Sequence, residues 1–291
     1  MQIQGGSADG AVRLRICWGI GAVWLVCFLS SLLFPAVAPV LAGIHTLMLI
    51  AIVVVHSSLL YGWAGASLYL AVGAVIGFVL EASSVANGFP FGSYVHNSPG
   101  PKPFGVPIGV VLVYVISGWY AWCIGRSVTL DQPNRIFGLG KLASPIIGAL
   151  VLAGLDYPFD PISATVQDAY TFAHPSGQFG VPLTNYLGWI FTGWVLFQLF
   201  ALLEHRFKPA PVSARKEYWL LPCLIWLLIP VQLLFSWAAA PDGTVSVGRS
   251  TFVIADIYEA GFAGALFSMV LPAFAAIVRL LSSQPASTRH P

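Results

Sequence analysis

The amino-acid sequence predicts an all-α fold, a polytopic bundle of about eight transmembrane helices that forms a single membrane domain over residues 1–291. Only 8% of the residues are charged and 57% are hydrophobic, whereas a soluble domain carries about 25% charged residues. The apolar stretches run nearly unbroken for about 20 residues, the length that a helix needs to cross a bilayer. This composition excludes a soluble globular enzyme, a disordered chain and a nucleic-acid-binding protein, which would carry a basic patch.

Eight apolar stretches are long enough to cross the membrane. The first follows Arg13 and Arg15 and is similar to a signal peptide, but no cleavage site of the A-x-A type follows it, so we interpret it as a retained helix. Pro35 and Pro39 mark the turn after it. In chain order, the predicted spans are 14–34, 39–61, 64–86, 106–125, 138–156, 183–204, 217–238 and 252–281.

The distribution of Lys and Arg predicts the orientation of the spans. If the N-terminus is cytoplasmic, 11 of the 13 cations lie inside and only Lys102 and Arg249 lie outside, as the positive-inside rule requires. Glu204 and His205 then belong to a solvated cytoplasmic loop. An odd number of spans would mix the two sets of cations. We therefore expect eight helices in the inner (cytoplasmic) membrane, with both termini in the cytoplasm.

An internal repeat with an offset of 75 residues relates spans three and four to spans five and six. Without a gap, Phe-Gly-Val-Pro at 104–107 aligns with the same tetrapeptide at 179–182, and Glu81 aligns with Asp156. The repeat units cover about 64–125 and 138–204. Because the offset copies one helix pair onto the next, the sequence predicts a parallel repeat rather than an inverted one.

The segments that connect the helices of each unit, 87–105 and 157–182, are long and contain Gly, Pro and several aromatic residues. At membrane depth, irregular backbone is tolerated only where it is buried in protein or lines a cavity. We therefore expect both segments to fold back as a lid over the outer end of the bundle.

Titratable side chains collect in the outer half of the predicted bundle. Intramembrane ionisable residues are candidates for a functional site because burying them is costly. Structural alternatives stay open: Asp160 could only start a turn before Pro161, Asp256 could cap span eight, and Glu259 and His45 could bridge helices. The candidates are Glu81, Asp156 and Asp160 at the ends of spans three and five, Asp256 and Glu259 on one face of span eight, and His45 in span two.

These acids suggest carbocation chemistry. Burial favours the neutral form of a carboxylic acid, which can protonate an apolar alkene to give a tertiary cation. Aromatic faces stabilise such a cation, and a second carboxylate can position a water and take its proton. The sequence holds no GxxxxGK[ST], DDxxD or HExxH motif, so we expect no metal and no cofactor. The acids therefore favour acid-initiated hydration or cyclisation of an isoprenoid.

Two stretches carry a family resemblance. Glu81 is followed by Gly-Phe-Pro-Phe-Gly-Ser-Tyr at 88–94, and Asp156 is followed by Phe-Gly-Val-Pro-Leu-Thr-Asn-Tyr-Leu-Gly-Trp at 179–189. Over roughly residues 60–200 the chain resembles the bacterial and archaeal carotenoid biosynthesis membrane proteins, which include the 1',2'-hydratase and the bisanhydrobacterioruberin hydratase. The resemblance implies cofactor-free addition of water to the terminal double bond of a linear carotenoid, a lipid-soluble substrate, and other carotenoid-pathway enzymes as candidate partners.

Taken together, these observations give a set of candidate residues and two reaction classes. A membrane terpene cyclase or isomerase would use the same acids as a hydratase, while a transporter would need polar residues along both halves of a pathway. A non-catalytic scaffold would have no use for buried acids. The family is expected to have a Trp-rich pair where this chain has Tyr170 and Phe172, and a second Tyr near His96. The candidate substrate-binding residues are His45, Phe89, Phe91, Tyr94, Phe104, Phe179, Asn185 and Trp189.

Overall fold

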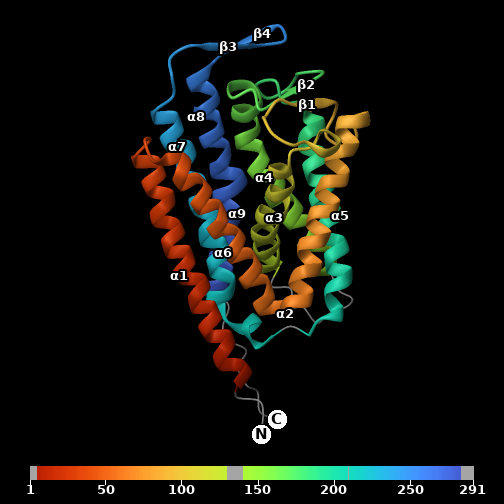
Figure 1. Ribbon diagram of the computed structural model, residues 1–291, viewed down its shortest axis with the longest axis vertical. Helices are drawn as coiled ribbons and strands as arrows, with labels where there is room; N and C mark the ends of the chain where they lie inside the picture. Colours follow the sequence, from red (N-terminus) through yellow and green to blue (C-terminus); the bar gives the residue numbers. More distant parts are fainter. Residues whose placement is uncertain (1–4, 130–139, 209, 283–291) are drawn as a thin grey trace.

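The computed structural model describes residues 5–129, 140–208 and 210–282, and it is a bundle of long helices (Figure 1). Among the described residues, seven helical segments are long and apolar enough to cross a membrane. Apolar side chains such as Val40 and Phe267 are exposed by 68% and 74% on the outside of the bundle, as a lipid-facing surface requires. The long helices are α1 (Gly5–Leu33), α2 (Ala38–Asn87), α3 (Ile108–Thr129), α4 (Gly140–Asp160), α5 (Leu183–Leu203), α6 (Lys216–Leu228) with α7 (Val231–Ala238), and α8 (Ile254–Ala265) with α9 (Leu271–Ser282).

The 50-residue helix α2 accounts for two of the predicted spans. Its helical geometry breaks at Gly62, where φ is 68° and ψ is 176°, a conformation that is essentially restricted to glycine. Figure 1 shows that α2 runs down the bundle and returns alongside it. The two arms correspond to predicted spans 39–61 and 64–86, so the described part of the chain crosses the bundle eight times. Both ends of the described chain therefore lie at the same end of the bundle.

Short elements complete the fold. The hairpin of β3 (Thr244–Val247) and β4 (Ser250–Val253) connects α7 to α8. A π-helix, η2 (Pro161–Val166), extends α4, and a second, η5 (Leu266–Val270), joins α8 to α9. Within the described ranges, three 3-10 turns lie in the connections, η1 (Pro103–Gly105), η3 (Glu204–Arg206) and η4 (Pro211–Ala214).

The two connecting segments of the repeat meet at one end of the bundle. The strands β1 (Tyr94–His96) and β2 (Tyr170–Phe172) pair antiparallel, with Tyr94 opposite Phe172. We call the segments that carry them, 88–107 and 167–182, the lid. They cover the ends of α3, α4 and α5 (Figure 1), as the sequence predicts, although the start of the second segment continues as helix through η2.

The repeated tetrapeptide has the same unusual backbone in both copies. Phe104 and Gly105 have φ values of 52° and 81°, and Phe179 and Gly180 have 51° and 97°. A positive φ is uncommon for a residue other than glycine, so two matching pairs are strong evidence of equivalent structure. Both helix pairs enter and leave the membrane in the same direction, which makes the repeat parallel.

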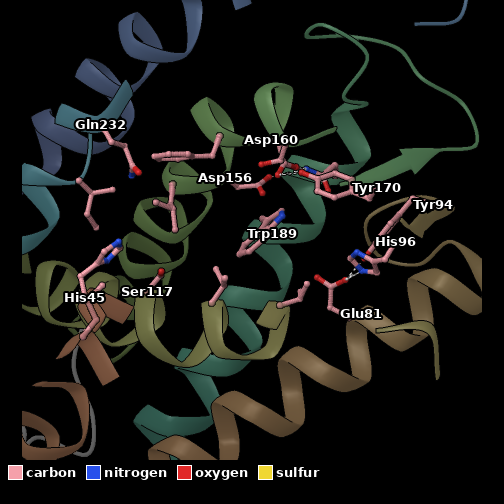
Figure 2. Close-up of a pocket in the computed structure, with 18 of the residues that line it drawn as sticks. His45, Glu81, Tyr94, His96, Ser117, Asp156, Asp160, Tyr170, Trp189 and Gln232 are labelled. Atoms are coloured by element: carbon pink, nitrogen blue, oxygen red, sulfur yellow. Dashed lines mark hydrogen bonds and ion pairs between the residues drawn. The ribbon is translucent and has the colours of Figure 1, made fainter. Parts of the chain in front are cut away.

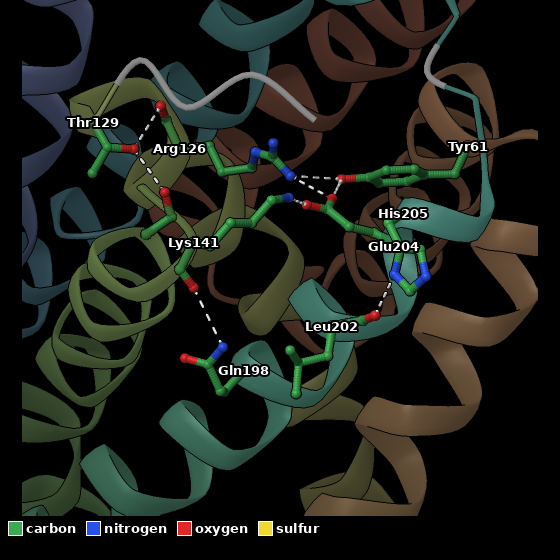
Figure 3. A network of polar contacts seen from close by, with 9 residues as sticks. Tyr61, Arg126, Thr129, Lys141, Gln198, Leu202, Glu204 and His205 are labelled. Atoms are coloured by element: carbon green, nitrogen blue, oxygen red, sulfur yellow. Dashed lines mark hydrogen bonds and ion pairs between the residues drawn. The ribbon is translucent and has the colours of Figure 1, made fainter. Parts of the chain in front are cut away.

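A buried ion-pair network lies at the end opposite the lid (Figure 3). The Glu204 carboxylate pairs with Arg126 of α3 and Lys141 of α4, and it accepts a hydrogen bond of 2.5 Å from Tyr61 beside the break in α2. Glu204 is 1% exposed, so the expectation that it belongs to a solvated loop is wrong. Two cations from neighbouring helices compensate its charge, and the network ties α2, α3 and α4 to η3, which directly follows α5.

Candidate active site

A cavity of about 360 Å³ lies beneath the lid and is lined by residues of α1, α2, α3, α4, α5 and α7 (Figure 2). Its wall is mostly apolar, and three carboxylic acids from two helices reach into it. The cavity therefore brings together most of the polar residues that the sequence predicts. The predicted residues in its wall are His45, Glu81, Tyr94, Asp156, Asp160, Asn185 and Trp189.

Glu81 projects from the second arm of α2 and is 3% exposed. Its Oε1 accepts a hydrogen bond of 2.6 Å from the Tyr114 hydroxyl, and its Oε2 accepts one from the Tyr94 hydroxyl. The His96 Nε2 atom lies 3.7 Å from Oε2. Burial, together with the neighbouring Glu81 charge, raises the pKa of Tyr94 above its usual range, so this phenol stays protonated and remains a donor to Glu81.

Asp156 and Asp160 lie on successive turns of α4 and share one hydrogen-bond donor. The Asn185 Nδ2 atom donates to Asp156 Oδ2 at 2.8 Å and to Asp160 Oδ2 at 2.5 Å. The two oxygens are therefore at most about 5.3 Å apart, the sum of these distances. Two ionised carboxylates at that separation repel by about 3 kcal/mol with an effective dielectric constant of about 20. The pair therefore favours a single negative charge and one retained proton.

The lid completes the hydrogen bonding of this pair. The Tyr170 hydroxyl of β2 donates to Asp160 Oδ1, so Asp160 accepts hydrogen bonds at both oxygens. Burial raises the pKa of Tyr170 above its usual range, which keeps this phenol a donor. Asp160 does not merely start a turn, because its side chain lines the cavity and is 8% exposed. Among the described residues, no group of three His, Cys, Asp or Glu is arranged to hold a metal ion.

Two aromatic residues that the repeat makes equivalent pack against each other beside the cavity. Tyr114 and Trp189 are equivalent under the 75-residue offset, and their rings stack with centroids 4.5 Å apart and planes at 22°. Figure 2 shows Trp189 between Glu81 and Asp156, which are also equivalent. Phe91 is fully buried behind Trp189, with ring centroids 6.1 Å apart. It therefore supports the wall rather than contacting the cavity.

Besides Phe91, five of the predicted residues lie outside the cavity wall. Asp256 and Glu259 are exposed on α8. Helix α8 begins at Ile254, so Asp256 is in its first turn, where a carboxylate interacts favourably with the helix dipole without being buried. The Phe89 and Phe104 side chains are 56% and 82% exposed, and Phe179 packs on Phe252 with ring centroids 5.3 Å apart. The structure therefore does not bring these five together with the other candidates.

Several residues in or beside the wall were not among the predicted site residues. Tyr114 could have been found from the repeat, since it occupies the position of Trp189 in the first unit. His96, Tyr170 and Phe172 stand out in the sequence only as departures from the family pattern. Ser117 and Gln232 also line the cavity, but no sequence pattern marks them.

The comparison with protein-family models supports the resemblance seen in the sequence. The model described as Carotenoid biosynthesis protein matches residues 36–254, about three quarters of the chain. No curated protein and no solved structure matches the chain. The matched segment contains both repeat units and all three acids of the cavity. The chain belongs to the carotenoid biosynthesis protein family.

Proposed function

We propose that the protein catalyses the cofactor-independent addition of water to the terminal C=C bond of a linear carotenoid or another isoprenoid. The observation that carries this proposal is the burial of Glu81, Asp156 and Asp160 in one mostly apolar cavity. An apolar wall suits a hydrocarbon chain, and a buried acid in contact with that chain can protonate it. Membership of the carotenoid biosynthesis family supports the substrate class.

The size of the cavity favours binding of one end of the substrate. At roughly 30 Å³ per heavy atom, the volume of about 360 Å³ holds about 12 heavy atoms, or about two isoprene units. The remaining chain of a carotenoid would then lie between the helices and the lipid. This arrangement would place the terminal double bond, rather than a central one, beside the acids.

In the proposed mechanism, Asp156 is the proton donor. Asp160 accepts hydrogen bonds from described residues at both oxygens, whereas Asp156 accepts one, from Asn185 at Oδ2. The retained proton of the pair is therefore best held by Asp156. Its O–H bond breaks as a C–H bond forms at the less substituted alkene carbon, which leaves a tertiary cation. The face of Trp189 stabilises that cation without reacting with it.

Glu81 is the base of the second step. Two phenols hold its carboxylate at the other side of Trp189, where it can bind a water molecule. The water oxygen forms the C–O bond to the cation, and the proton released from the water passes to Glu81. Return of this proton to Asp156 through solvent completes the cycle, so that water and alkene give a tertiary alcohol. His96 of the lid, whose Nε2 atom lies 3.7 Å from Glu81 Oε2, offers a route for this proton away from Glu81.

A membrane cyclase or isomerase is the second candidate. The observation that favours it is the aromatic wall, which includes Trp24, Phe28, Tyr94, Phe172 and Trp189 and would stabilise a cation that no water reaches. A transporter fits less well, because the buried network around Glu204 closes the end opposite the lid. We also propose that the protein lies in the cytoplasmic membrane with both termini in the cytoplasm. Other carotenoid-pathway enzymes are its candidate partners.

Expression in a lycopene-producing bacterial host tests the proposal, with mass spectrometry of the pigments as the readout. A gain of one or two water masses is the expected result, and an isomer of unchanged mass would select the cyclase or isomerase instead. Unchanged lycopene beside normal amounts of membrane protein would contradict both reactions for a linear carotenoid substrate. Glu81→Gln should lose the product, while the matched Glu259→Gln, an exposed residue outside the cavity, should retain it.

A further inference from the structure

A second polar cluster lies across the cavity from the acids. It consists of His45 on the first arm of α2, Ser117 on α3 and Gln232 on α7, and we call it the His45 cluster. Figure 2 shows its three side chains on one side of the cavity, with Glu81 and Asp156 on the other. Nothing in the proposed proton transfer uses these residues, so they require a separate explanation.

The polar groups of the His45 cluster lack protein partners. None of the three side chains makes a hydrogen bond with another residue in the described part of the chain, and the His45 Nδ1 atom is buried without a partner. The His45 ring is held in place by edge-to-face packing on Phe28, with centroids 6.2 Å apart. Leaving a buried polar atom such as His45 Nδ1 unpaired is unfavourable. At the other side of the cavity, by contrast, each acid has hydrogen-bond partners.

We infer that the His45 cluster is a subsite for an oxygen-bearing group, a hydroxyl or a carbonyl, on the isoprenoid that the cavity binds. Histidine, serine and glutamine side chains can each donate and accept hydrogen bonds, so they match either group. A purely hydrocarbon occupant would leave all three unpaired. The inference rests on the proposed function, because it takes the occupant to be an isoprenoid, and it adds that an oxygenated isoprenoid is preferred over a hydrocarbon.

The preference for an oxygenated isoprenoid follows from how a polar site discriminates between ligands with and without a hydrogen-bonding group. A site built to hydrogen-bond a hydroxyl disfavours the analogue that lacks it, because its own polar groups are then left unpaired. One or two hydrogen bonds of ordinary net strength correspond to roughly a tenfold difference in affinity. Hydrocarbon substrates would therefore still bind and react, but more weakly than oxygenated ones of the same length.

Binding of two small probes to the purified protein in nanodiscs tests this inference without requiring turnover. Geraniol has 11 heavy atoms, and 2,6-dimethylocta-2,6-diene is the same skeleton without the hydroxyl. Trp24 and Trp189 line the cavity, so tryptophan fluorescence reports occupancy, with protein-free nanodiscs correcting for partition into lipid. We expect geraniol to bind about tenfold more tightly than the diene.

Substitution of the cluster should remove that difference. His45→Phe should bring the two affinities to within about twofold while leaving the affinity for the diene nearly unchanged. Leu49→Met, one turn along α2 and also in the cavity wall, is the matched control and should retain the tenfold preference. Gln232→Leu makes the same test from another helix if the His45 variant fails to accumulate.

Three results would overturn the inference. Equal affinities of the wild-type protein for the two probes would show that the cluster does not select an oxygen-bearing group. A preference that survives in both His45→Phe and Gln232→Leu would place the selecting groups elsewhere. Binding of neither probe would overturn the isoprenoid occupant itself and with it the inference. Failure of water addition alone would show only in the pigment assay, with the tenfold binding preference intact.

Discussion

Replacement of Asp156 by Asn separates proton donation from the packing of the cavity. The amide has nearly the shape of the acid, but it has no proton that it can transfer to an alkene. General acid catalysis typically contributes 10²–10⁴-fold, so water addition should fall by about 100- to 10,000-fold. This loss corresponds to a rise in the activation barrier of roughly 3–5 kcal/mol.

The same substitution should not destabilise the protein. The Asp156 and Asp160 oxygens bound by Asn185 are at most about 5.3 Å apart, the sum of 2.8 and 2.5 Å, and their repulsion when both are ionised is about 3 kcal/mol. This repulsion keeps Asp156 neutral in the proposed mechanism, so asparagine changes no charge, and its side-chain oxygen can still accept the hydrogen bond from Asn185. The thermal unfolding temperature in detergent should therefore be close to that of the wild type.

The assay is pigment mass spectrometry in the lycopene-producing host, normalised to the amount of protein in the membrane. Asp256→Asn is the matched control, because it makes the same change at an exposed acid outside the cavity, and its product yield should equal the wild-type yield. A yield within tenfold of wild type for Asp156→Asn would refute its assignment as the donor. An equal loss in the Asp256 variant would refute the choice of this cavity as the site.

Three substitutions away from Asp156 test the ion-pair network, the turn in α2 and the lid. Glu204→Gln leaves two buried cations facing an uncharged amide, so the free energy of unfolding should fall by roughly 3–5 kcal/mol; an unchanged melting temperature would contradict the role of the network. Gly62→Ala forces a side chain into a glycine conformation and should cost about 1–3 kcal/mol, whereas Gly43→Ala, a helical position with open space around it, should not lower the melting temperature. Tyr170→Phe removes the hydrogen bond to Asp160 and should lower product yield by roughly 10- to 100-fold. Because the pKa of Tyr170 is raised above its usual range, the wild-type rate should show no loss near pH 10 from ionisation of this phenol, and such a loss would argue that the lid is open to water.

The sequence predicted the crossings well from the length of the apolar stretches, and the repeat predicted that Glu81 and Asp156 would lie near each other, as they do in one cavity wall. The offset of 75 residues places Glu81 and Asp156 at equivalent positions without any knowledge of packing. Helix faces were harder to predict, because lipid is as apolar as the protein interior, so a membrane helix shows little difference between its two sides. Asp256 and Glu259 share a face, as expected, but nothing in their surroundings tells whether that face points inward. For the same reason the inward position of Gln232 could not be predicted.

Burial of charged residues was also hard to predict where partners come from distant segments. Glu204 follows a span and precedes several basic residues, a pattern typical of a solvated loop. Its partners Arg126 and Lys141 lie 78 and 63 residues earlier in the chain, and only the folded bundle brings them within reach. Buried charges become tolerable when they are paired, which hydropathy along the chain does not report.

The proposed chemistry also gives a reason for a duplicated helix pair. Hydration of an alkene requires one group that gives a proton and another that takes one, on either side of a single double bond. Two copies of a helix that ends in an acid supply both groups around the stacked rings of Tyr114 and Trp189. The copies then differ where their acids need different protonation states. The positions equivalent to Asp160 and Asn185 in the first unit are both valine, at residues 85 and 110. The first unit therefore presents a single carboxylate held by phenols, while the second presents a pair of acids that shares one charge. In the proposed mechanism this divergence assigns the base to the first unit and the acid to the second.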